Sequence, residues 1–319
     1  MKHKIKEKGT GKKGNLSRFC LSPFLLKMAL EEDIGSGDLT TETLIPGNLR
    51  GEAEILAKEA GVLSGGPVAA EIFRLRDRSL KVRLFRKEGA RIRKSERMMK
   101  ISGRVSSILE AERVALNFLG RLSGIATLTH SFVERIKGTK AKIFDTRKTT
   151  PLWRELEKYA VRCGGGGNHR QGLWDEILVK DNHWKAVLGL GRRYPGCPLE
   201  KIIRRKGPKR IVEIEVENLR QLASLLEGTL VPDRILLDNF PVRELRRAVL
   251  FVRGLDWLLR RRYGLRRKRP ELEASGGIHL GNVRQVAGTG VDRISVGRLT
   301  HSAPALDFSL RLSQIRSAV

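Results

Sequence analysis

The chain has few cysteines, few aromatic residues and no long apolar run. Its three cysteines, Cys20, Cys163 and Cys197, lie far apart and form no Cys-x-x-Cys pair, so neither a disulfide framework nor a zinc site is expected. No apolar run approaches the roughly 20 residues that span a bilayer, and no signal-peptide core follows the lysine-rich N-terminus. We therefore expect a soluble, cytoplasmic protein with no membrane partner.

Acidic residues are scarce beside basic ones. The chain has 63 Lys and Arg against 35 Asp and Glu, a formal net charge of +28, and such a field favours anionic partners. Much of the excess lies in residues 2–13, within a tail over 1–17 that we expect to be disordered, and in residues 260–269. Neither run carries interleaved stacking aromatics. We expect nucleic acid to bind only non-specifically, through the tail.

The first part of the chain mixes helical and strand-like segments. Residues 23–32 predict a helix, and residues 106–119 and 124–136 predict two more. Residues 51–58 and 80–85 alternate apolar and polar side chains, as half-buried strands do. Together these segments predict an α+β sandwich domain.

From about residue 140, strand-like runs alternate with helical stretches. This pattern predicts parallel strands joined by right-handed crossovers. At least six units suit a barrel, and an open doubly wound sheet stays possible from the pattern alone. The absence of Gly-x-Gly-x-x-Gly after the first strand weighs against a dinucleotide site. The predicted strands are 142–145, 177–180, 211–216, 234–238, 272–275 and 293–297, and the predicted helices are 152–162, 217–227, 241–253 and 280–288.

Chemically varied residues stand at or near the carboxyl ends of these strands, where a βα barrel builds its active site. Charged residues also mark where strands meet solvent, but a succession with differing chemistry favours a site. These residues are Asp145, Lys180, Glu215, Asp238, Ser275 and Gly297. Because Glu213, Glu215 and Glu217 share one side of their strand, we expect some to be structural and only the best placed to be catalytic.

The loops after the strands carry cations and glycines. Arg147 and Lys148 can bind carboxylate or phosphate groups. Residues 164–170 place an Asn-His-Arg sequence after four glycines, and residues 275–277 can bind a phosphate through backbone N–H groups. His169 and, less strongly, His183 are the candidate site histidines. No spacing of ligands indicates a permanently held metal.

Ordered motifs from about residue 25 to residue 312 resemble quinolinate phosphoribosyltransferases, also called carboxylating nicotinate-nucleotide pyrophosphorylases. The matching segments are Ala111–Asn117, Leu122–Thr127, Asp145–Pro151, Lys158–Gly166, Asn168–Arg170, Lys180–His183, Leu237–Asn239, Ala274–Ile278, Ser295–Gly297 and Leu299–Ser302. Among the departures from the family pattern are Gly167 and Arg298, which stand where a bulkier and a smaller residue are common.

The resemblance implies the fold and the reaction. The fold would be an N-terminal sandwich domain over 18–130, joined by residues 303–319, and an incomplete (β/α) barrel over 131–302. Quinolinate and phosphoribosyl pyrophosphate would give nicotinate mononucleotide, pyrophosphate and carbon dioxide, with Mg²⁺, in NAD biosynthesis. The enzyme would act as a homodimer, alone or within a larger oligomer, with its sites at the subunit interface.

The resemblance also assigns roles to residues. Those around the quinolinate carboxylates would be Arg147, His169, Arg170 and Lys180, with Arg113 from the partner subunit. Lys148 and Lys180 would face the phosphoribosyl donor, and Glu215 and Asp238 would stand near the ribose and the Mg²⁺. The 5′-phosphate would be held by Ser275, Gly276, Gly277 and Gly297, with His301 close. The catalytic set would be Lys148, Lys180, Glu215 and Asp238.

Two other readings remain open from the sequence. The first is an enzyme of the same fold that takes another base, such as nicotinate, although the arginines and His169 favour a dicarboxylate. The second is a nucleic-acid-binding protein that uses the net charge, which predicts steeply salt-dependent binding but does not account for the ordered residues at the strand ends.

Overall fold

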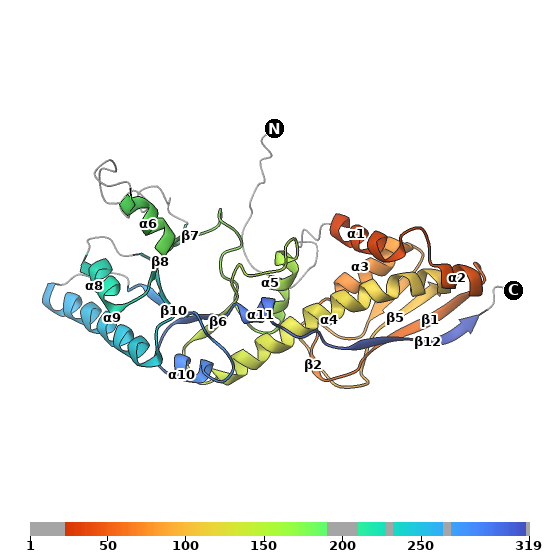
Figure 1. Cartoon of the computed structure of the whole chain (residues 1–319). Helices are drawn as coiled ribbons and strands as arrows, with labels where there is room; N and C mark the ends of the chain where they lie inside the picture. The colour runs from red at the N-terminus through yellow and green to blue at the C-terminus, as the bar shows by residue number, and fades with distance from the viewer. Residues whose placement is uncertain (1–22, 190–209, 228–231, 264–268, 317–319) are drawn as a thin grey trace.

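Two large sheets, joined by one long helix, make up the computed structural model (Figure 1). The structure describes residues 23–189, 210–227, 232–263 and 269–316. The predicted basic tail lies outside these ranges, as do residues 264–268 of the second basic run. Among the described residues, no helix is long and apolar enough to cross a membrane.

The first sheet is antiparallel and has the strand order β12-β1-β5-β3. Its strands are β1 (Arg50–Ala57), β3 (Lys81–Leu84), β5 (Arg97–Arg104) and β12 (Phe308–Arg316). Every second residue of β1 is buried, which is the pattern that predicted a half-buried strand here. The helices α1 (Pro23–Ile34), α2 (Leu39–Leu44) and α3 (Gly66–Arg76) and the short strands β2 (Gly61–Val62) and β4 (Arg91–Ile92) complete this part.

One continuous helix, α4 (Val105–Arg135), replaces the two helices expected over 106–119 and 124–136. It runs from the antiparallel sheet to the parallel sheet in Figure 1. The two-helix prediction was wrong because Gly120 and Gly124 do not interrupt the helix. A Cβ at Gly120 would lie 2.6 Å from the Leu306 carbonyl oxygen, and one at Gly124 would collide with that of Pro304. These glycines let residues 304–306 lie directly against α4.

The second sheet has six strands in the order β6-β11-β10-β9-β8-β7, and every pair in it is parallel. The strands are β6 (Lys142–Phe144), β7 (Ile177–Val179), β8 (Val212–Val216), β9 (Arg234–Asp238), β10 (Glu271–Ser275) and β11 (Arg293–Ser295). The intervening helices are α5 (Arg154–Cys163), α6 (Asp181–Gly189), α8 (Leu219–Glu227), α9 (Val242–Tyr263), α10 (Val283–Ala287) and α11 (Arg298–His301).

The order of this sheet starts at β6 and ends at β7, so within the described residues these two strands do not pair and the barrel is incomplete. The predicted fold class, a sandwich domain with an incomplete (β/α) barrel of parallel strands, is confirmed. Each of the six predicted strands of the barrel is present, with ends that differ by at most two residues. The predicted division at residue 130 stays a prediction, and α4 runs across it.

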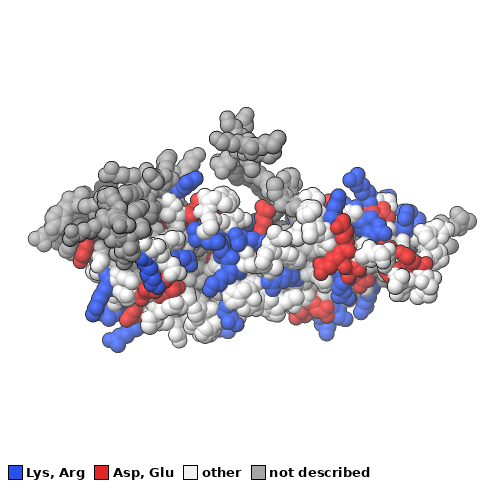
Figure 2. Space-filling model, turned by 45° about the horizontal axis from the view of Figure 1, so that its top comes forward, with Lys and Arg blue, Asp and Glu red and all other residues white. Residues whose placement is uncertain are grey.

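Basic side chains cover both halves of the molecule. In Figure 2, Lys and Arg lie on the antiparallel and the parallel half of this face, with acidic residues between them. The described residues therefore carry much of the positive charge as a distributed surface, rather than in one stripe.

Candidate active site

An open pocket of about 850 Å³ lies at the carboxyl ends of the parallel strands, a volume that suits a small-molecule ligand. Segments from all six strands contribute to its wall. The residues predicted from the sequence that line it are Arg147, Lys148, His169, Arg170, Lys180, Glu215, Asp238, Ser275, Gly276, Gly277, Gly297 and His301. The structure therefore brings almost all of the predicted set together.

Among the residues to which the resemblance assigns a role, Arg113 is the one that does not line this pocket. It is exposed on α4. The sequence assigned it to the active site of a partner subunit, and a single chain leaves that assignment a prediction.

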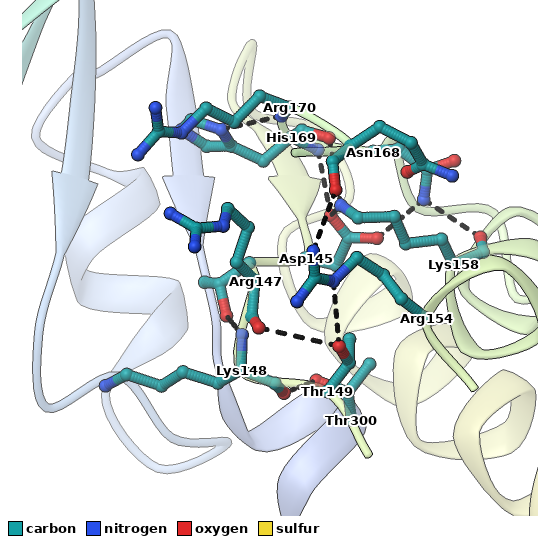
Figure 3. A network of polar contacts seen from close by, with 12 residues as sticks. Asp145, Arg147, Lys148, Thr149, Arg154, Lys158, Asn168, His169, Arg170 and Thr300 are labelled. Carbon is teal, nitrogen blue, oxygen red and sulfur yellow. Dashed lines mark hydrogen bonds and ion pairs between the residues drawn. The ribbon is translucent and has the colours of Figure 1, made fainter. Parts of the chain in front are cut away.

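The loop after β6 holds its main chain rigidly and leaves two cations at the pocket. The Thr300 hydroxyl donates to the Lys148 carbonyl oxygen at 2.6 Å, and the Lys148 N–H donates to the Thr146 hydroxyl at 3.0 Å. The Nε of Arg147 is buried without a hydrogen-bond partner. Figure 3 shows the side chains of Arg147, Lys148 and Arg170 extending to the same side of the network.

Arg147 and Arg170 lie close enough to repel each other. Burial lowers the pKa of Arg170, and the positive charge of Arg147 lowers it further. The Arg170 guanidinium also donates to the Glu176 carbonyl oxygen at 3.2 Å. Two guanidinium groups held together at a pocket favour an anion between them, because the anion removes the repulsion.

A buried ion pair fixes the segment that carries His169. The Lys158 Nζ lies 2.5 Å from a carboxylate oxygen of Asp145, and both side chains are fully buried. Asp145 also accepts from the Asn168 side chain at 2.6 Å and from the His169 N–H at 2.8 Å (Figure 3). Burial raises the pKa of Asp145 and lowers that of Lys158, so each charge depends on the other. Asp145, although it follows a barrel strand, is therefore a supporting residue and not part of the pocket wall.

Two glutamates lie beneath His169 in the barrel interior. The His169 Nε2 is 3.1 Å from a Glu213 oxygen and 3.2 Å from a Glu273 oxygen, and neither glutamate is exposed. Glu273 also pairs with Arg293 at 2.6 Å. Ligand atoms of His169, Glu176 and Glu213 lie within 4.8 Å of one another, as in a metal site. Since Glu176 already pairs with Arg234 at 2.9 Å, we interpret the group as an ion-pair network.

Glu215 and Asp238 form the acidic side of the pocket and stand on the adjacent strands β8 and β9. Lys180 lies 3.6 Å from a Glu215 oxygen. Burial raises the pKa of both carboxyls, while Lys180 opposes the rise in each. Carboxylate oxygens are ligands that Mg²⁺ accepts alongside substrate phosphates, and a divalent cation here would relieve the repulsion between the two acids. These two residues therefore fit a Mg²⁺ site.

Glycines shape the wall next to the acidic side, where Ser275 of β10 is the register partner of Asp238. Gly276 and Gly277 have φ of 88° and 62°, values that glycine adopts without strain. The Asn239 N–H donates to the Ser275 carbonyl oxygen at 2.8 Å, and the Asn282 side chain donates to that of Gly277 at 2.9 Å. The turn leaves backbone close to the pocket, as phosphate binding requires.

Gly297 lies in the loop after β11, the strand that pairs with β10. A Cβ at Gly297 would lie 3.1 Å from Lys148 and 3.2 Å from His301. The glycine lets both side chains approach the same point of the wall.

Several pocket residues were not predicted to have a role in ligand binding. Arg298, noted only as a departure from the family pattern, and His279 both line the wall. The candidate histidine His183 does not line the pocket; it is exposed, and its Nδ1 accepts from the Lys180 N–H at 2.8 Å. The other unpredicted lining residues are Thr146, Leu178, Leu236, Asn239, Ile278, Ser295 and Val296. Most are adjacent in sequence to a predicted residue or precede one by two positions, so the strand-end pattern could have located them.

Comparisons with known proteins give one consistent result. A family model for the N-terminal domain of quinolinate phosphoribosyl transferase matches residues 38–123, and one for the C-terminal domain matches residues 125–311. The chain is 39% identical over 294 residues to a carboxylating nicotinate-nucleotide pyrophosphorylase of Mycobacterium leprae, covering 90% of this chain and 95% of the relative.

A second relative and a solved structure agree. A probable carboxylating nicotinate-nucleotide pyrophosphorylase of Bacillus subtilis is 39% identical over 296 residues, which cover 92% of this chain and 94% of that protein. The crystal structure of NadC from Streptococcus pyogenes superposes with a TM-score of 0.80 at 36% identity, covering 95% of this chain and 99% of that one.

Proposed function

This chain belongs to the quinolinate phosphoribosyltransferase family, and we propose that it catalyses the reaction of that family. Quinolinate and phosphoribosyl pyrophosphate would give nicotinate mononucleotide, pyrophosphate and carbon dioxide, a step of NAD biosynthesis in the cytoplasm. One observation carries the proposal: three arginines, two lysines, two carboxylates and a glycine turn surround one pocket. A dicarboxylate and a polyphosphate together need this combination of charges.

The cations divide between the two substrates. Arg147 and Arg170 repel each other at the pocket wall, so we assign them, with Lys180, to the two carboxylates of quinolinate. Guanidinium groups bind carboxylates in a bidentate manner. His169 lines the same pocket.

The phosphoribosyl donor would occupy the rest of the pocket. We assign its 5′-phosphate to the turn over 275–277 and to Gly297, with His301 beside it, and its pyrophosphate to Lys148. Mg²⁺, held by Glu215 and Asp238 directly or through water, would neutralise negative charge on the pyrophosphate.

Charge develops at two stages of the reaction. When the bond at the anomeric carbon breaks, positive charge develops on the ribose, and the carboxylates of Glu215 and Asp238 are placed to stabilise it while Lys148 stabilises the leaving group. The quinolinate nitrogen then bonds to that carbon and becomes cationic. The adjacent carboxylate leaves as carbon dioxide, and its electron pair stays on the ring carbon beside the cationic nitrogen until a proton arrives from solvent.

The decisive assay is carbon dioxide and nucleotide formation from quinolinate, phosphoribosyl pyrophosphate and Mg²⁺, with nicotinate as the parallel substrate. Arg147→Ala should lower kcat/KM for quinolinate roughly 100-fold, since two charge-assisted hydrogen bonds are lost. Arg246→Ala, which removes an exposed arginine of α9, is the matched control and should leave kcat/KM unchanged. Activity with nicotinate alone would keep the fold assignment and eliminate the decarboxylation.

The dimer carries its own test. We propose that Arg113 enters the site of the partner subunit, because it is exposed on α4 and outside its own pocket. Arg113→Ala and Lys180→Ala chains should each be inactive. After the two are unfolded and refolded together, the mixture should recover roughly a quarter of wild-type activity, since half of the dimers then hold one intact site. No recovery would place Arg113 outside the site.

A further inference from the structure

Arg154, the first residue of α5, connects two of the segments that form the pocket. Its Nε donates a hydrogen bond to the Thr149 hydroxyl at 3.0 Å (Figure 3), and its Nη1 donates to the Gln171 carbonyl oxygen at 3.2 Å. Arg154 itself does not line the pocket. In Figure 3 its side chain reaches the network from the side opposite to the guanidinium groups of Arg147 and Arg170. Arg154 therefore lies behind the pocket wall.

The two partners of Arg154 stand next to the two pocket arginines in the chain. Thr149 follows Arg147 by two residues, and Gln171 follows Arg170 directly. Arg147 belongs to the loop after β6 and Arg170 to the segment between α5 and β7, so the two arginines stand on separate stretches of main chain. One guanidinium thus joins both stretches at points where a displacement would move an arginine of the pocket.

Both stretches are also anchored at other points. At their base, the Asp145 carboxylate accepts from the His169 N–H at 2.8 Å. Further along the loop, Glu157 accepts from the Thr150 N–H at 3.1 Å and from its hydroxyl at 2.9 Å. The first contact joins the stretches close to β6, and the second fixes the loop to α5 alone. The connection through Arg154 is therefore a second joint between the stretches, beyond the one at their base.

A guanidinium suits this connection. Arginine holds five N–H donors in a planar fork, so two of its nitrogens can serve two acceptors in fixed directions, whereas lysine presents its donors from one nitrogen. The positive charge of Arg147 lies close enough to lower the pKa of Arg170, so the two pocket arginines repel each other. The hydrogen bonds of Arg154 oppose the separation that this repulsion favours.

We propose that Arg154 is a positioning residue for quinolinate: it fixes the spacing between the stretches that carry Arg147 and Arg170, so that the pocket takes two carboxylates on adjacent ring carbons. The inference rests on the proposed function and deepens it, because it names what sets the pocket for a dicarboxylate. Arg154 touches neither the substrate nor the reacting atoms. Its loss should therefore weaken quinolinate binding more than it slows the chemical step.

Steady-state kinetics of matched variants test the connection. Arg154→Lys keeps the positive charge and loses the two-ended hydrogen bond, and Thr149→Val keeps the branched shape and loses one acceptor. Each should raise KM for quinolinate roughly 10-fold and leave kcat and KM for phosphoribosyl pyrophosphate within about 2-fold. Thr149→Ser, which keeps the hydroxyl, should retain most of the wild-type behaviour. An unchanged KM for quinolinate in Arg154→Lys, or an equal loss for both substrates, would overturn the proposal.

The double variant shows whether the two residues act through one bond. Arg154→Lys combined with Thr149→Val should raise KM for quinolinate about as much as Arg154→Lys alone, because the second change removes a contact that is already lost. Losses that multiply would mean that the residues act independently, and would contradict the connection. Arg246→Lys, at an exposed position of α9, is the matched control for the arginine and should keep the wild-type KM.

Amide hydrogen exchange of the ligand-free enzyme, with calorimetry of quinolinate binding, separates the two proposals. In Arg154→Lys, amides over 146–152 and 169–175 should exchange roughly 10-fold faster, while those of β1 keep the wild-type rate and show that the variant is folded. Faster exchange in the variant, with no quinolinate bound by the wild type, would sink the proposed function and keep Arg154 as the joint between the two arginines. Unchanged exchange, with quinolinate bound by the wild type, would keep the proposed function and overturn the positioning role.

Discussion

Gly276 and Gly277 both have positive φ, but only Gly276 lacks room for a methyl group. A Cβ at Gly276 would lie 2.9 Å from the Asn239 nitrogen and would collide with its side-chain oxygen, while one at Gly277 would meet nothing within 4 Å. Gly276→Ala should therefore displace the turn and lower kcat/KM for phosphoribosyl pyrophosphate about 100-fold, as misplacement by about 1 Å does. Gly277→Ala should cost about 1–2 kcal/mol of backbone strain and much less activity. Similar kinetic losses in the two variants would contradict a role for close packing against Asn239.

For single residues, the sequence predicted those that line the pocket but not the buried charged residues that pack beneath them. Lys180 and Asp238 could be found because an apolar run ends at each of them, and Glu215 because it lies near the end of its predicted strand. Strand ends meet at one face of a barrel. Glu273 and Arg293 gave no such signal, since a charge within a strand points inward or outward according to a register that the sequence does not state. The partner of His169 could be identified only once β8 and β10 were placed.

Packing of α4 against residues 304–306 depends on a glycine inside a helix. Gly124→Ala should lower the free energy of unfolding by about 1–3 kcal/mol, because the new methyl group must push the Pro304 carbonyl away. Gly254→Ala, at an exposed position of α9 with nothing within 4 Å of the added Cβ, should instead stabilise by about 0.5–1 kcal/mol. Urea unfolding of both variants provides the measurement. A gain in stability in both would mean that the helix and residues 304–306 are not in close contact.

A single carboxylate ties the first strand of the parallel sheet to two others. Asp292, just before β11, accepts from Arg269 at 3.0 and 3.1 Å, from Lys140 at 2.8 Å and from the Leu272 N–H at 3.0 Å. Burial raises its pKa, but these partners outweigh burial and lower the pKa below 3.8. The folded state therefore favours the charged form, and the stabilisation is fully present above the unfolded value and lost as the pH falls through the folded value.

Asp292→Asn should accordingly lower the free energy of unfolding at pH 7 by about 1.5–3 kcal/mol. The difference from wild type should narrow as the pH falls below about 4. Denaturant unfolding at pH 7, 4 and 3 measures it, with the exposed Asp307→Asn as control. A difference that stays constant over this range would show that the charge of Asp292 is not what stabilises the sheet.

Elements were predicted best where a pattern is local. The alternating and apolar runs gave all six parallel strands, because strand periodicity requires only neighbouring residues. The prediction divided α4 because glycine usually weakens a helix. Residues 304–306, which pack closely against Gly120 and Gly124, lie almost two hundred residues later in the sequence.

The net charge of +28 belongs to the whole molecule and should show in its response to salt. We expect the chain to bind duplex DNA weakly, with an affinity that falls steeply with salt concentration. Deleting residues 1–17, which hold six lysines, should reduce the slope of log K against log salt by up to about 5. The deletion should leave kcat/KM for quinolinate unchanged. An unchanged slope would assign the DNA binding to the basic surface of Figure 2 instead.

The strand β12 pairs with β1 on the edge that β5 leaves open, and Ser313 contacts Glu52, 261 residues earlier. On the ribosome, the first sheet must therefore wait for its last strand until the entire parallel sheet has been synthesised. During that interval the edge of β1 is an unpaired template of the kind that recruits strands from other chains. Translation that pauses within the parallel sheet would prolong this exposure, so the speed of synthesis bears on how much of the protein reaches its folded state.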